Sequence, residues 1–112
     1  THIGRLWTSG GTNLAAVTFQ NESSSGWQYQ AFATPVTINA NTTYIVSYHT
    51  TTGFYSATGA YFASAFSNGP LRALGNAEGS GNGVFRYGSG GFPNQSYNAN
   101  NYWVDVVFEP QP

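Results

Sequence analysis

The fold is decided by the stretch Thr42-Thr43-Tyr44-Ile45-Val46-Ser47-Tyr48-His49. In an extended chain Tyr44, Val46 and Tyr48 point to one side, and the residues between them point to the other. β-Branched and aromatic residues, which favour strands, dominate the stretch. Because this alternation is unambiguous, the pattern predicts a β-strand near the centre of a sheet.

Similar short runs lie on both sides of this stretch, separated by Gly, Pro and Asn residues that favour turns. Further strands are expected at residues 3–8, 13–20, 27–32, 36–38, 60–66, 84–87 and 102–108. The Ser-Gly-Gly cluster at 9–11 predicts a hairpin between the first two. No segment keeps the 3.6-residue period of an amphipathic helix. The sequence predicts an all-β fold, an antiparallel β-sandwich of jelly-roll or immunoglobulin-like type with seven or eight strands.

Composition limits both the number of domains and the class of partner. A chain of 112 residues with 40% hydrophobic residues suffices for one core, so we expect a single β-sandwich domain over residues 1–112. Arg5, Arg72 and Arg86 are scattered singly, which argues against a nucleic-acid partner. No apolar run approaches the roughly 20 residues of a membrane span. Neither nucleic acid nor a membrane span is therefore predicted.

A series of motifs extends over nearly the whole chain. In order they are Gly4-Arg5-Leu6-Trp7, Gly26-Trp27-Gln28, Pro35-Val36-Thr37-Ile38, residues 42–49, Gly81-Asn82-Gly83-Val84, Phe92-Pro93 and Asn101-Tyr102-Trp103-Val104-Asp105-Val106-Val107-Phe108. In this order and spacing they resemble a bacterial domain-of-unknown-function family found beside immunoglobulin-like, discoidin-like and glycoside-hydrolase modules in large secreted proteins. The resemblance implies a β-sandwich accessory module that is secreted and extracellular, with a polysaccharide or cell-surface glycan as its partner.

The same resemblance implies that roughly one to three strands should precede this sequence. We therefore expect the domain to lack its first strands. Three explanations are open: the strands were trimmed away, they were cleaved but stay associated, or a strand from another chain replaces them. In the last case a complementing strand would fill an open sheet edge by strand exchange.

Several side chains in the sequence have the chemistry of sugar recognition. Aromatic faces stack on the C–H surfaces of sugar rings, and amides and charged groups bind the hydroxyls. In loop-like stretches such residues are Phe54, Tyr55, Tyr61, Asn82, Arg86, Tyr87 and Tyr97, and His49 is added at the end of its strand. The alternative for the loop tyrosines is that they cover their own loops. Trp7, Trp27, Tyr44, Trp103 and Phe108 fall within predicted strands and are expected in the core.

Metal binding and catalysis have little support in the sequence. Two His and no Cys are too few for a zinc site. Calcium, which accepts backbone and amide oxygens, stays an open and unassigned alternative, and no other cofactor is expected. The four acids, Glu22, Glu78, Asp105 and Glu109, are widely separated, so the paired carboxylates of a glycosidase are not expected. A triad of a serine with His49 and Asp105 lacks a nucleophile-elbow sequence, so we expect no enzyme activity.

The leading hypothesis is a non-catalytic, carbohydrate-binding accessory module of a secreted bacterial protein. The alternative is an extracellular structural or adhesive unit of a filament, surface layer or adhesin, which assembles by strand exchange at an open sheet edge.

Overall fold

The computed structural model describes residues 2–23, 26–50, 57–68, 71–75, 82–87, 91–96 and 100–106. Every regular element in these residues is a β-strand, and every strand pair is antiparallel. The all-β, antiparallel prediction is therefore confirmed for the described part of the chain. The chain divides into two compact units, a first unit of Thr1–Gly53 with Val104–Pro112 and a second unit of Phe54–Trp103.

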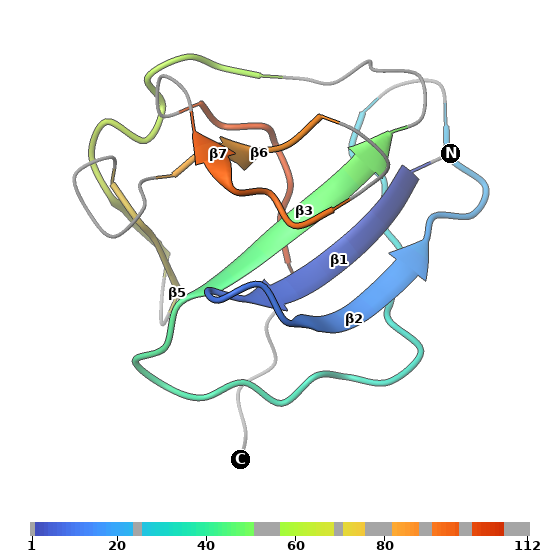
Figure 1. Ribbon diagram of the computed structural model, residues 1–112. Helices are drawn as coiled ribbons and strands as arrows, with labels where there is room; N and C mark the ends of the chain where they lie inside the picture. The colour runs from blue at the N-terminus through green and yellow to red at the C-terminus, as the bar shows by residue number, and fades with distance from the viewer. Residues whose placement is uncertain are drawn as a thin grey trace. The chain divides into compact units, whose positions relative to one another are not determined.

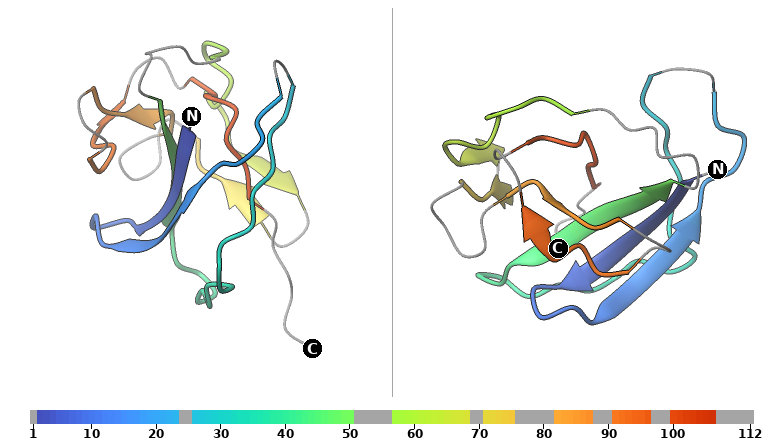
Figure 2. Two further views of the ribbon diagram at one scale, coloured as in Figure 1. Left: turned by 90° about the vertical axis from the view of Figure 1, so that its right-hand side faces the viewer. Right: turned by 45° about the horizontal axis from the view of Figure 1, so that its top comes forward.

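The first unit is built on a three-stranded sheet. Its strands are β1 (His2–Thr8), β2 (Asn13–Thr18) and β3 (Tyr44–Thr50), in the order β2-β1-β3 (Figures 1 and 2). The predicted hairpin is confirmed: the backbone N–H of Thr8 donates to the carbonyl of Thr12 over 2.9 Å, which closes the turn between β1 and β2. The prediction that residues 42–49 form a central strand is wrong in this sheet, because β1 is the strand with a neighbour on each side.

The register of β3 confirms the two faces expected from its alternation. Gly4 lies opposite Tyr48, Leu6 opposite Val46 and Thr8 opposite Tyr44, so these residues share one face. Gly4 is buried, and a Cβ there would lie 3.0 Å from the Phe19 ring. A larger residue at Gly4 would therefore force this ring to move.

The opposite face carries Trp7, which is 7% exposed and is the one buried hydrophobic residue of the described part. Its indole N–H donates to Ser47 Oγ over 2.8 Å and joins β1 to β3. The expectation that Trp7 lies in the core is confirmed. Trp27, 65% exposed, and Trp103, 38% exposed, were expected there too, and both expectations are wrong.

Two of the predicted strands in the first unit do not form. Residues 27–32 and 36–38 have no assigned strand, although their sequence alternates as a strand does. Hydrogen bonding of the backbone to a neighbour defines a strand, and side chains from this region serve instead as single links. Gln30 Oε1 accepts the backbone N–H of Gln20 over 3.2 Å, and Gln28 Oε1 accepts that of Ser23 over 2.8 Å.

The second unit contains two short antiparallel pairs. They are β4 (Phe66–Asn68) with β5 (Leu71–Ala73), and β6 (Val84–Phe85) with β7 (Gln95–Ser96). The predicted strand at 60–66 is wrong except at its last residue. A turn occupies its start, where Ala60 has a φ of 57° and its carbonyl accepts the N–H of Ala63.

The predicted strand at 102–108 is also wrong where the structure describes it, over residues 102–106. Trp103 has a φ of 58°, which is left-handed rather than extended, so a strand cannot run through it. Among the described residues, the structure contains no helix with the length and hydrophobicity needed to cross a membrane.

Candidate ligand-binding site

The best-defined group of exposed aromatic residues lies in the second unit and is held by one pair of backbone hydrogen bonds. The N–H of Thr58 donates to the carbonyl of Asn101, and the N–H of Asn101 donates to the carbonyl of Thr58, each over 2.9 Å. This antiparallel bridge joins two segments that are far apart in the sequence. It brings the turn that contains Tyr61 beside the segment that contains Trp103.

The conformation of Trp103 is fixed by hydrogen bonds at two points. The backbone N–H of Trp103 donates to Asn101 Oδ1 over 2.6 Å, and Asn101 itself is only 9% exposed. An Asn side chain that binds the backbone two residues ahead is a common way to form a turn. At the other end of the residue, the indole N–H donates to Thr58 Oγ1 over 2.9 Å. The ring is thereby held at the surface with a defined orientation.

Tyr61, Phe62 and Trp103 form what we call the aromatic cluster. The Tyr61 ring lies 5.1 Å from the Trp103 ring at an interplanar angle of 67°, and 5.1 Å from the Phe62 ring at 78°. Tyr61 is 42% exposed, and Phe62 is half-buried. Edge-to-face contacts of this kind stabilise aromatic pairs beyond the area they bury. The cluster therefore presents aromatic surface to solvent on a supported base.

A second group of aromatic residues is linked to this cluster through Tyr102, which directly precedes Trp103. The Phe85 ring lies 6.4 Å from the Tyr102 ring and 5.7 Å from the Tyr87 ring. Tyr87 is 77% exposed. Exposed Arg86 lies against Gly91, where a Cβ would be 2.9 Å from Nη1, and it has no carboxylate partner among the described residues. An accessible guanidinium and phenol are thus found together.

Asn82, another sequence-predicted ligand residue, is engaged within the fold. One amide N–H of Asn82 donates to the carbonyl of Leu74 over 2.8 Å, and its Oδ1 accepts the N–H of Gly83 over 2.7 Å. The bond to Leu74 connects two parts of the second unit, and the bond to Gly83 is local. They leave one amide N–H of Asn82 for any further partner.

Of the remaining sequence-predicted residues, His49 is the one that the structure describes, and it lies outside this group. His49 lies in β3 of the first unit, half-buried and opposite Ile3. Phe54, Tyr55 and Tyr97 fall outside the described residues. The structure thus places Tyr61, Asn82, Arg86 and Tyr87 in one unit, and His49 in the other.

Trp103 is the residue that reasoning from sequence missed. The apolar run from Tyr102 to Phe108 predicts a buried strand, which would place Trp103 in the core. The signal that would have found it is the Asn100-Asn101 pair just before, because an Asn side chain can bind the backbone two residues on and so favours a turn. A turn at that point brings the following tryptophan to the surface.

In the first unit, the Glu22 carboxylate is in contact with His2. Glu22 Oε2 accepts the backbone N–H of His2 over 2.8 Å, and Oε1 lies 2.6 Å from His2 Nδ1. The backbone hydrogen bond, with the side-chain bond to His2 next, holds the pKa of Glu22 below its ordinary value of 4.5. Within the described ranges, no three His, Asp or Glu side chains gather as a metal site would require.

Comparison with known protein families finds a match over residues 1–104 to the family described as Domain of unknown function (DUF4082). No curated protein and no solved structure matches the chain.

Proposed function

The chain belongs to the DUF4082 family, and we propose that it is a non-catalytic module that binds carbohydrate through Tyr61 and Trp103. The observation that supports this proposal is the pair of exposed rings in contact, with the indole fixed by Thr58 and Asn101. Rings fixed before binding lose little conformational freedom when a ligand arrives. In this proposal the module is secreted and serves as an accessory domain of a larger bacterial protein.

The angle between the two rings suggests the form of the ligand. Planes that meet at 67° cannot both lie flat against one extended surface, as a crystalline polysaccharide would require. They can contact a single glycan chain, whose pyranose stacks on one ring while its edge meets the other. A soluble or amorphous chain therefore fits the aromatic cluster better than a crystal face does.

Other polar groups of the second unit can bind sugar hydroxyls. Arg86 offers guanidinium N–H donors, and the phenol of Tyr87 can donate or accept. Both side chains are exposed. Carbohydrate hydroxyls are neutral, which suits a chain with only 6% charged residues. The aromatic cluster itself contains no acid–base pair, so we propose binding without chemistry.

The test is retention of the 112-residue chain on a panel of soluble and insoluble polysaccharides. Trp103→Ala is expected to weaken retention at least ten-fold, a loss typical of a central aromatic contact. Tyr61→Ala should weaken it in the same direction. Circular dichroism of each variant checks that the fold is kept.

Trp27→Ala is the matched control, because Trp27 is also exposed but lies in the first unit. Retention should be unchanged in this variant. The proposal fails if no polysaccharide retains the chain, or if Trp27→Ala removes retention and Trp103→Ala does not. Comparing the crystalline and amorphous forms of a retained glycan then tests the inference drawn from the ring angle.

A further inference from the structure

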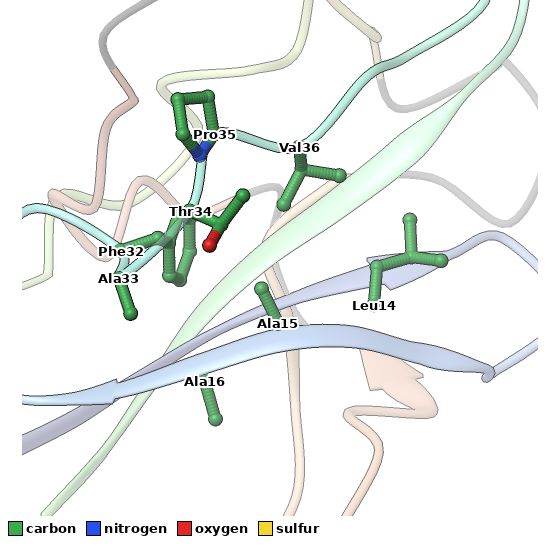
Figure 3. Close-up of a pocket in the computed structure, with 8 residues that line it drawn as sticks. All are labelled: Leu14, Ala15, Ala16, Phe32, Ala33, Thr34, Pro35 and Val36. Carbon is green, nitrogen blue, oxygen red and sulfur yellow. The ribbon is translucent and has the colours of Figure 1, made fainter.

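A groove of about 410 Å³ lies in the first unit between β2 and the segment 32–36 (Figure 3). It is lined by Leu14, Ala15, Ala16, Phe32, Ala33, Thr34, Pro35 and Val36. Consecutive residues of a strand point to opposite faces, and Figure 3 shows Ala15 and Ala16 turned to opposite sides of β2. A space that touches both of them and Leu14 therefore runs along the edge of the strand.

Both walls of this groove have unused hydrogen-bonding backbone. In the described part of the chain, β2 pairs with β1 on one side and with no strand on the other. The backbone of the segment 32–36 forms no hydrogen bond with any described residue. The edge of β2 and the segment 32–36, which bends at Ala33 and Thr34, thus lie on the two sides of the groove, and each has backbone groups that form no hydrogen bond in the described part of the chain.

The sequence of the second wall indicates that it is suited to pairing. Residues 27–32 and 36–38, which reach this wall at its two ends, have the alternation, aromatic content and β-branched residues of strands, yet no strand is assigned there. A sequence with strand propensity forms a strand only when a neighbour supplies the hydrogen bonds. The mismatch between sequence and structure at this wall is explained if the neighbour is a peptide other than the described residues of this chain.

We propose that this groove is a docking site for an extended, uncharged peptide segment of another polypeptide, which pairs with the free edge of β2. Only an extended backbone offers donors and acceptors at the spacing of a strand edge. None of the eight lining residues is charged, so a charged side chain in the groove would lose water without gaining a partner. The three alanines leave room for apolar side chains of the incoming peptide.

Edge strands in monomeric proteins are usually protected by Lys, Pro or a bulge against such pairing. β2 has the sequence Asn-Leu-Ala-Ala-Val-Thr, without a charge or a proline. Its one irregularity is a register shift opposite Leu6 and Trp7, at the start of the strand. The shift leaves Leu14 without a partner on β1, while Ala15 and Ala16, which also line the groove, keep the regular register. This docking site uses only the first unit and is independent of the carbohydrate proposal.

The test uses the whole 112-residue chain labelled with ¹⁵N and a pool of blocked octapeptides. In these peptides Val, Ile, Tyr or Phe alternates with Thr or Ser, and a length of eight residues spans the edge of β2 at about 3.3 Å per residue. The expected result is saturable shifts of backbone amides in β2 and in residues 32–36. The same pool N-methylated on alternate amides keeps the side chains but loses donors, and should bind at least ten-fold more weakly.

Ala33→Lys places a charge in the wall at an exposed position and should reduce binding at least ten-fold. Ala31→Lys is its matched control, because Ala31 is exposed in the same segment but does not line the groove. The proposal is overturned if the pool causes no shifts at about 1 mM peptide. Equal binding of the N-methylated pool also overturns it. Concentration-dependent shifts of the same amides in the absence of peptide would also overturn the proposal. They would identify a second copy of this chain as the occupant of the groove.

Discussion

Gly83 has a backbone conformation and an environment that together require glycine. Its φ is 74°, in the left-handed region, and a Cβ built there would clash with the carbonyl oxygen of Asn100. Gly26 has a similar φ of 84°, but a Cβ there would meet nothing within 4 Å. A substitution at Gly26 therefore carries only the free-energy cost of the left-handed conformation, whereas one at Gly83 carries that cost and the cost of a steric clash.

We expect Gly83→Ala to lower the free energy of unfolding by more than about 2 kcal/mol. The left-handed conformation costs an L-residue about 1–2 kcal/mol, and the clash with the Asn100 backbone adds to this. Gly26→Ala, the control, should lose only about 1 kcal/mol, the conformational part. Urea unfolding of both variants measures the difference. Equal losses would show that the close approach of Asn100 to Gly83 is not a constraint.

Trp103 illustrates how one residue changes the interpretation of a candidate site. Its surroundings in the sequence are apolar, and this favoured burial in a strand. The hydrogen bond from its backbone N–H to Asn101 Oδ1 instead closes a turn, and the ring is 38% exposed. Local side-chain bonds of this kind compete with sheet formation and are not visible in hydrophobic periodicity.

Among the elements, those predicted well are the ones whose pairing is local or whose alternation is strong. The hairpin of β1 and β2 follows from a turn cluster between two short runs, and β3 follows from its alternating faces. The predictions of strands at 27–32 and 36–38 were wrong. Alternation shows the strand propensity of a segment, but it does not show whether a neighbouring strand is present to pair with it. The central position predicted for residues 42–49 was wrong for the same reason. In this sheet β3 pairs with β1 and lies at one side of it.

The start of β1 is attached to the segment after β2 by the contacts between His2 and Glu22, and this attachment should depend on pH. The pKa of Glu22 is lower in the folded chain than its ordinary value of 4.5. A carboxyl of this kind stabilises the fold above its unfolded pKa and loses that contribution as the pH falls through the folded pKa. The contribution should therefore be complete above about pH 5 and decline below pH 4.5.

Glu22→Gln tests this dependence. The variant should be less stable than the parent chain near neutral pH, and the difference should shrink as the pH falls below 4.5. Because the contact is partly exposed, the effect should be modest and should decrease at high salt. Thermal unfolding followed by circular dichroism across pH 3–7 gives the comparison. A difference that is constant over this range would contradict the lowered pKa.

At the scale of the whole molecule, the two proposed binding sites use different units. The aromatic cluster belongs to the second unit, and the peptide groove belongs to the first. We expect Ala33→Lys to leave retention on polysaccharide unchanged and Trp103→Ala to leave peptide binding unchanged. Each variant is therefore a specificity control for the other assay. Loss of both activities in either variant would indicate that the sites are coupled or that the variant is misfolded.

The three tryptophans give the most direct measurement of the central claim, that carbohydrate binds at Tyr61 and Trp103. Each indole N–H gives one resonance in a ¹H–¹⁵N spectrum, and the chain has three, at Trp7, Trp27 and Trp103. Trp7 is buried and Trp27 is exposed in the first unit, so both serve as internal references. On titration with soluble oligosaccharides of the panel, we expect the Trp103 indole to shift and the other two to stay in place. A saturable shift of the Trp27 indole alone, or no shift with any oligosaccharide, would contradict the account.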